Sequence, residues 1–215
     1  MTANASAQAH PSDLELAALI SSKICHDVIG PVGAIHNGLE ILAEDDGADA
    51  QAYALDVIKN VTEQASARLQ FARFAFGASG SAGALIDLQM ARQLSEAFVN
   101  DGKRTLHWNG AAGHMPKNSA KLLLNMIASA VSTIPRGGTI DVVIEGEMDT
   151  PVFTLTCQGR GVRRPNFLGD LVEGQALEDI DSMSIQAYYT WRLAALAGMP
   201  IDITETDDAV IMKAA

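Results

Sequence analysis

Several residue types are scarce in this 215-residue chain, and each scarcity excludes a class of protein. Only two cysteines occur, Cys25 and Cys157, which excludes a disulfide framework and fits a reducing compartment. Basic residues number 15 against 26 acidic ones, and the resulting net charge of −11 argues against nucleic acid as a partner. No apolar run approaches the ~20 residues of a membrane helix, and residues 1–11 lack the basic and apolar segments of a signal peptide. We therefore expect a soluble, cytoplasmic protein.

Residues 12–76 have the apolar spacing of two long helices. Ser12 and Glu15 have the spacing of a capping box at the start of the first helix. A hairpin of this size has too small a core to be stable alone, so the spacing predicts that two copies pair as a dimeric four-helix bundle. The alternative is packing only on the rest of the same chain. The apolar or small residues that repeat every three or four positions are Ala17, Ser21, Ile24, Val28, Val32, Ile35, Leu39 and Leu42, then Leu55, Ile58, Thr62, Ala65, Leu69, Ala72 and Phe76.

The remaining segments have different compositions. Residues 1–11 are small and polar and predict a disordered tail, and residues 77–84 are rich in Gly and Ser and predict a flexible linker. In residues 85–215, helical spacing alternates with strand-like segments, which predicts helices layered on one face of a mixed, mostly antiparallel sheet. The expected fold class is a helical hairpin forming a dimeric bundle, followed by an α/β sandwich. The expected helices are 87–100, 117–134 and 184–197, and the expected strands are 105–108, 139–145, 152–157, 201–206 and 209–212.

His26 is the residue of the first helix that most needs an explanation. At ~100° per residue it lies about 200° around the helix from the apolar stripe, and therefore faces solvent. Gly30 and Gly33 follow on the same face, although each glycine costs a helix ~1 kcal/mol relative to alanine. Pro31 removes a backbone hydrogen bond and bends the helix nearby. One explanation is that His26 is an ordinary surface residue and that the helix tolerates the two glycines. The other is that a second backbone approaches His26 closely.

Residues 26–35 (HDVIGPVGAI) resemble the H-box of dimeric sensor histidine kinases, whose histidine is the phosphorylated nucleophile. The chemistry suits this role because neutral imidazole, with an ordinary pKa of ~6.5, is nucleophilic at cellular pH. Asp27 can accept a hydrogen bond from one ring nitrogen and leave the other free to attack phosphorus. Cys25 projects away from His26 and completes no zinc spacing, so we expect no metal site.

Residues 85–215 resemble the ATPase domain of histidine kinases, the GHKL or Bergerat fold. The segment 122–130 (LLLNMIASA) looks like the N-box, and 157–161 (CQGRG) looks like the Asp-x-Gly-x-Gly box. The nucleotide-binding residues are nevertheless replaced: Ser129 stands for the magnesium-binding asparagine, Cys157 for the adenine-reading aspartate, Ser132 for a lysine, and residues 184–187 for the glycine-rich loop. A thiol cannot replace a carboxylate toward adenine, and serine is a poor magnesium ligand. We expect no nucleotide and no other cofactor.

An H-box hairpin joined to a nucleotide-blind, kinase-like domain is identified as a ChpT-type histidine phosphotransferase of the cell-cycle phosphorelays of alphaproteobacteria. The resemblance implies a homodimer that shuttles a phosphoryl group through His26 between receiver-domain aspartates, without ATP. Its implied partners are the receiver of a CckA-like hybrid kinase and CtrA-like and CpdR-like response regulators, with magnesium held by the receiver. We expect no nucleic-acid or membrane partner. The alternatives are a divergent ATP-using sensor kinase and a non-catalytic adaptor that binds receivers.

Several further residues are candidates for contact with a receiver. Arg160, Arg163 and Arg164 lie within five positions, and arginines suit the acidic pocket of a receiver, although a solubilised loop is the simpler explanation. The other candidates lie near His26 on the first helix: Lys23, Ile29, Gly30 and Gly33.

Overall fold

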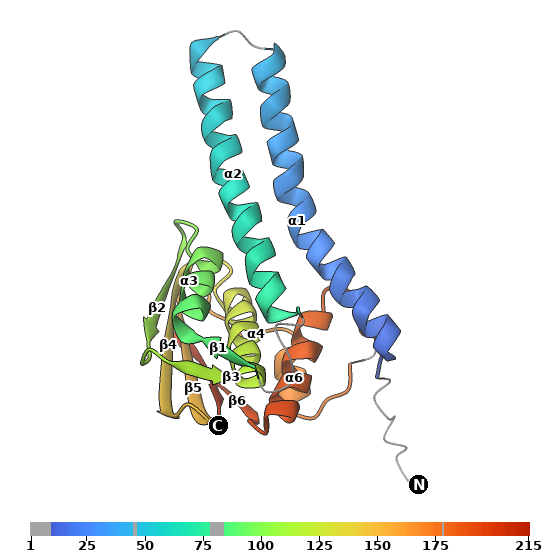
Figure 1. The fold of residues 1–215 in the computed structure, drawn as a ribbon, viewed down its shortest axis with the longest axis vertical. Coiled ribbons are helices and arrows are strands. Elements are labelled where there is room, and N and C mark those ends of the chain that lie inside the picture. Colours follow the sequence, from blue (N-terminus) through green and yellow to red (C-terminus); the bar gives the residue numbers. More distant parts are fainter. Residues whose placement is uncertain (1–9, 45–46, 78–83, 178) are drawn as a thin grey trace.

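The computed structural model describes residues 10–44, 47–77, 84–177 and 179–215, which form a long helical hairpin standing on an α/β domain (Figure 1). Helix α1 spans Asp13–Glu44 and helix α2 spans Ala48–Ala75. The predicted capping box begins α1: the Ser12 N–H donates to Glu15 Oε2 at 2.9 Å, and the Glu15 N–H donates to Ser12 Oγ at 3.3 Å. The backbone N–H and the Oγ of Ser12 both donate to the Glu15 carboxylate and lower the pKa of Glu15. Most of the predicted tail, and the linker between Gly77 and Ala84, lie outside the described residues.

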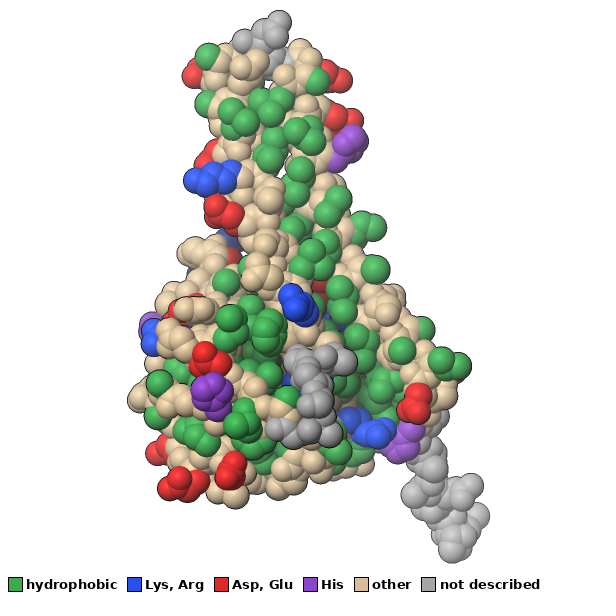
Figure 2. Space-filling view, in the orientation of Figure 1, with side chains coloured by type: hydrophobic (Ala, Val, Ile, Leu, Met, Phe, Trp, Pro, Cys, Tyr) green, Lys and Arg blue, Asp and Glu red, His purple; other side chains and the backbone are tan. Residues whose placement is uncertain are grey.

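The apolar residues of the hairpin are divided between two faces. Ile24, Val28 and Ile35 of α1 are half-buried, whereas Val32 and Leu39, which were assigned to the same buried stripe, are 53% and 52% exposed. Helix α2 shows the same division, since Ala65 is buried while Leu55 and Leu69 are 57% and 47% exposed. One partner helix cannot cover so wide an apolar arc. Figure 2 accordingly shows hydrophobic side chains along the surface of both arms.

Helix α1 is long and apolar enough, by length and composition alone, to cross a membrane. It reaches this threshold on average composition, because Lys23, His26 and Asp27 interrupt its apolar residues and it contains no uninterrupted apolar run of ~20 residues. Some of its apolar side chains contact α2, and the others are the exposed residues just described. The opposite face of the helix carries His26 and Asp27.

The α/β domain contains one five-stranded sheet with the order β2-β4-β5-β7-β6, in which only β2 and β4 are parallel. Strands β1 and β3 form a separate antiparallel pair. The predicted helices and strands are confirmed; β1, β3 and α5 are too short to show a periodic pattern. The elements are β1 (Leu85–Asp87), α3 (Leu88–Val99), β2 (Arg104–Asn109), β3 (His114–Pro116), α4 (Lys117–Thr133), β4 (Gly138–Glu147), β5 (Thr150–Gln158), α5 (Leu168–Val172), α6 (Ile185–Ala197), β6 (Ile201–Glu205) and β7 (Ala209–Ala214).

Helices α3, α4 and α6 lie together on one side of the five-stranded sheet (Figure 1). Inward-facing residues of β5 such as Phe153 and Leu155 are buried, while the intervening Thr154 is half-buried, as expected for a sheet with one covered face. Helix α6 ends at Gly198, whose φ of +68° is the left-handed conformation that glycine adopts without strain. The core of the domain therefore lies between this sheet and the helical layer.

The base of the hairpin packs directly on the α/β domain. The rings of Phe71 in α2 and Phe98 in α3 stack at 4.0 Å between centroids. The Asn125 Nδ2 of α4 donates to the Ala75 carbonyl at 3.0 Å, and Lys121 Nζ donates to the Phe76 carbonyl at 3.4 Å. These side chains satisfy carbonyls at the end of α2 that have no partner within the helix. The segment predicted to be a separate hairpin is thus attached to the domain through this junction.

Candidate functional site

His26 lies on the outer face of α1, as its position in the sequence predicted. Its side chain is 76% exposed. An added Cβ at Gly30 or Gly33 would meet no atom within 4 Å, so neither glycine is required by packing within the described chain. Ile29 on the same helix is 71% exposed. This part of α1 therefore presents an imidazole, bare backbone and an apolar side chain to solvent.

Asp27 is the immediate electrostatic neighbour of His26. Its Oδ1 lies 3.5 Å from His26 Nδ1, at the outer limit for a hydrogen bond. Its other oxygen is paired with the ammonium group of Lys23, one helical turn earlier. The carboxylate is therefore held with one oxygen toward the imidazole. Among the described residues the His26 Nε2 makes no hydrogen bond, which leaves that nitrogen available to an incoming group.

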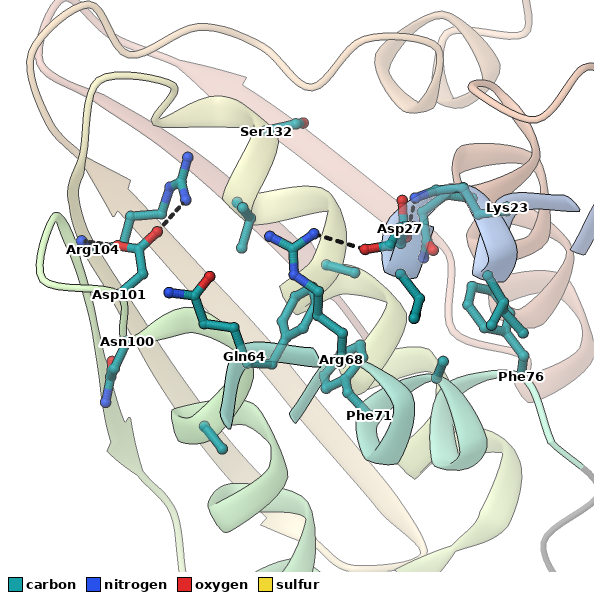
Figure 3. Close-up of a pocket in the computed structure, with 18 of the residues that line it drawn as sticks. Lys23, Asp27, Gln64, Arg68, Phe71, Phe76, Asn100, Asp101, Arg104 and Ser132 are labelled. Carbon is teal, nitrogen blue, oxygen red and sulfur yellow. Dashed lines mark hydrogen bonds and ion pairs between the residues drawn. The ribbon is translucent and has the colours of Figure 1, made fainter. Parts of the chain in front are cut away.

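Arg68 of α2 forms a further contact at this site that the sequence analysis did not identify. Its Nη1 donates to the backbone carbonyl of Asp27 at 3.0 Å, across the hairpin (Figure 3). The sequence contains a signal for the acceptor of this bond, although not for its donor. A proline in a helix leaves the carbonyl four residues earlier without its donor, and the residue four before Pro31 is Asp27.

A cavity of about 410 Å³ lies between the hairpin and the α/β domain. Figure 3 shows Asp27, Lys23 and Arg68 on its hairpin side, and Asp101 and Arg104 on its domain side. Phenylalanines form its apolar walls and four basic side chains line it, two of which are paired with carboxylates. The residues concerned are Phe71, Phe76, Phe98, Lys23, Arg68, Arg104 and Arg163.

The three arginines proposed for receiver contact have different environments. Arg160 is exposed. Arg163 is exposed, lines the cavity, and donates its backbone N–H to the Thr133 carbonyl at 2.9 Å. Arg164 is engaged within the domain, since its guanidinium contacts Glu173 and donates to the Gly169 carbonyl at 2.7 Å. Lys23 is likewise engaged by Asp27.

Most of the residues that replace nucleotide ligands are buried in the domain, whereas Ser132 is exposed and Gln186 is half-buried, and both line the cavity. Cys157 is fully buried, and this burial raises the pKa of its thiol to about 11. Ser129 is buried, and its Oγ donates to the Asn125 carbonyl at 3.0 Å. Ile185 is fully buried, and Gln186 Nε2 donates to Asn125 Oδ1 at 2.7 Å. Each of these side chains takes part in packing or in a hydrogen bond within the chain. Among the described residues, no cluster of three or more His, Cys, Asp or Glu side chains is arranged to hold a metal ion.

The helical hairpin with its exposed histidine and the α/β domain below it match the sequence and structure of histidine phosphotransferases. Residues 88–209 match the histidine phosphotransferase C-terminal domain family. Over 204 residues the chain is 48% identical to protein phosphotransferase ChpT of Brucella abortus (strain 2308), covering 94% of this chain and 96% of that protein. It also matches a solved structure of a bacterial phosphotransferase with a TM-score of 0.90 and 43% identity, covering 98% of this chain and 100% of the other. The chain belongs to the ChpT-type histidine phosphotransferase family.

Proposed function

We propose that this protein relays phosphoryl groups between receiver-domain aspartates through a phosphohistidine at His26. The observation that carries the proposal is the geometry of His26, which is exposed on α1 with Nδ1 facing the Asp27 carboxylate and Nε2 open to solvent. A nucleophile for an aspartyl phosphate on another protein must be reachable by a whole domain. The open surface at Gly30 and Gly33 supports this, because no side chain there obstructs an approaching backbone.

The transfer is a displacement at phosphorus. The Nε2 lone pair of His26 forms the new P–N bond while the P–O bond to the receiver aspartate breaks, and that aspartate leaves as a carboxylate. The ring gains positive charge in this step, and Asp27 stabilises it through the Nδ1 proton. The reverse step returns the phosphoryl group to the same or another aspartate. In this scheme magnesium is held by the receiver, and this chain supplies only a positioned nucleophile.

The relay works without ATP in this proposal. The support is that the positions expected to read adenine and bind magnesium carry Cys157 and Ser129, both buried and engaged within the core. The divergent-kinase alternative requires a nucleotide to bind despite these replacements. The adaptor alternative requires binding of receivers without phosphorylation.

The location, oligomeric state and partners that we propose follow from the family, and the receiver contacts follow from which side chains are exposed. We infer a cytoplasmic homodimer that operates in a two-component phosphorelay of the cell cycle. Its partners are then a CckA-like hybrid kinase receiver and CtrA-like and CpdR-like regulators. Arg160 and Arg163, with the exposed Ile29, are the side chains best placed to contact a receiver. Arg164 and Lys23 are less available because Glu173 and Asp27 bind them.

The decisive experiment is incubation of the full chain with a receiver phosphorylated by acetyl phosphate. Acid-labile label should appear on the wild-type protein and be absent from His26→Ala, whose fold should be unchanged because the side chain is exposed. Asp27→Asn should slow transfer by roughly 10–100-fold, by analogy with carboxylates that orient metal-bound histidines. Retention of full transfer by His26→Ala, with label on another residue, would falsify the proposal.

Labelled ATP with magnesium is the matched control in the same assay. It should neither bind measurably by calorimetry nor label the protein. Micromolar binding would favour the kinase alternative. Receiver binding without transfer of label would favour the adaptor.

A further inference from the structure

The turn of α1 that carries His26 has a gap in its hydrogen-bond ladder. An α-helical carbonyl normally accepts from the N–H four residues later, and for Asp27 that residue is Pro31, which has no N–H. The unpartnered carbonyl therefore belongs to the residue that directly follows the proposed nucleophile. Helices lose rigidity and change direction where such a bond is missing.

Arg68 supplies the missing donor from the other arm of the hairpin. Its guanidinium reaches the Asp27 carbonyl at 3.0 Å, within the normal range for a hydrogen bond (Figure 3). The donor is charged, and charge-assisted hydrogen bonds are stronger than neutral ones. The arrangement connects α2 to α1 at the turn where α1 would otherwise be weakest.

We propose that Arg68 is a positioning residue for phosphotransfer: it replaces the hydrogen bond lost at Pro31 and thereby holds the His26–Asp27 turn in one geometry. The inference rests on the proposed function of His26. Arg68 acts through the backbone of Asp27, while Lys23 orients the carboxylate of the same residue. The backbone of Asp27 is thus held by α2, and its side chain is held by the preceding turn of α1.

Loss of the Arg68 guanidinium changes the geometry of the His26–Asp27 turn more than it changes the stability of the hairpin. Arg68 lies at the exposed rim of the hairpin, so water can satisfy the Asp27 carbonyl once the guanidinium is removed. Water does not tie α1 to α2, however, and the imidazole then samples a wider range of positions. A loose nucleophile reduces the rate within the complex, since reactive geometry tolerates little displacement.

A double-mutant cycle in the full-length protein tests this inference. Arg68→Met should lower the single-turnover transfer rate about tenfold, a change equivalent to about 1.4 kcal/mol. In the Pro31→Ala background, where the restored N–H partners the carbonyl, the same substitution should cost less than about twofold. The receiver's apparent KM should change by less than about twofold in both backgrounds, because Arg68 is not assigned a receiver contact. Arg73→Met, an exposed arginine on the same helix, is the control and should transfer at the wild-type rate.

A second measurement does not depend on phosphotransfer. Amide hydrogen exchange at Gly30 and Val32, which flank Pro31, should accelerate in Arg68→Met but not when Arg68→Met is added to Pro31→Ala. Equal rate losses in both backgrounds, or unchanged exchange in Arg68→Met, would overturn the inference. If His26→Ala still transferred phosphate, the proposed function would fail, while the exchange data would still report whether Arg68 compensates for Pro31.

Discussion

Burial determines the chemistry of Cys157. Its side chain is fully buried in the core beneath α4, and desolvation raises the pKa of the thiol to about 11. The thiolate is the reactive form of cysteine, so about one molecule in a thousand is reactive at pH 8 even before access is considered. Cys25, the neighbour of His26, is exposed.

The two cysteines should therefore react very differently. Iodoacetamide at pH 8 should alkylate Cys25 in the native protein within minutes and leave Cys157 unmodified, as read by peptide mass spectrometry. Unfolding in guanidinium should make both thiols reactive. Rapid native modification of Cys157 would show that the position is open, and would reopen the question of a ligand site there.

The glycines of α1 divide by environment, which gives a matched set of variants. Gly30 and Gly33 are open, whereas a Cβ at Gly38 would lie 2.7 Å from Cγ1 of Ile58 in α2. Gly33→Ala should raise the free energy of unfolding by up to ~1 kcal/mol, because alanine is the better helix former. Gly30→Ala should gain less, because Pro31 follows directly and its ring disfavours a helical residue that carries a Cβ before it. Gly38→Ala should instead destabilise the hairpin, since overpacking typically costs ~1–3 kcal/mol.

Phosphotransfer should show the opposite ranking. If a receiver backbone contacts the bare surface, Gly30→Ala or Gly33→Ala raises the receiver's apparent KM, and Gly33→Ala does so while leaving the thermal stability equal or higher. Gly38→Ala should change KM little at temperatures where the hairpin is folded. Wild-type kinetics for both open-glycine variants would contradict a close backbone contact at this face.

Periodic elements were predictable from the sequence, and short or contact-dependent ones were not. The helix ending before Pro135 and the strand pair around Cys157 follow from local spacing and turn residues. The three-residue strands β1 and β3 hold each other by pairing across about 30 positions, which no local pattern records. His26 and Asp27 are adjacent in the sequence, so their contact could be predicted. Arg68 reaches Asp27 only because the hairpin folds, which is why spacing along α1 could not identify it.

At the scale of the whole molecule, the hairpin of a single copy leaves several apolar side chains exposed to solvent. Val32 and Leu39 on α1, with Leu55 and Leu69 on α2, are each 47–57% exposed. Clustered exposed apolar side chains mark interaction surfaces, and homodimers related by a two-fold axis are the commonest assemblies.

Charge introduced on this surface should separate the copies. Light scattering should give a dimer for the wild-type protein at micromolar concentration and a monomer for Leu55→Glu or Leu69→Glu. Both positions are exposed in the single chain, so the far-ultraviolet circular dichroism of each variant should remain helical. A wild-type monomer at that concentration would contradict the four-helix bundle.

The junction at the base of α2 has a consequence for the direction of the reaction. Asn125 binds the end of α2 and also accepts from Gln186 of α6, so the hairpin and the domain meet a partner as one body. A receiver that docks on such a body loses little entropy in ordering it. In the proposed function the same arrangement serves the forward and reverse steps, and because that relay would consume no ATP, the protein would contribute no driving force. The proposal then predicts that the net flow of phosphate through His26 is set by the relative phosphoryl-transfer potentials and concentrations of the aspartyl phosphates on either side.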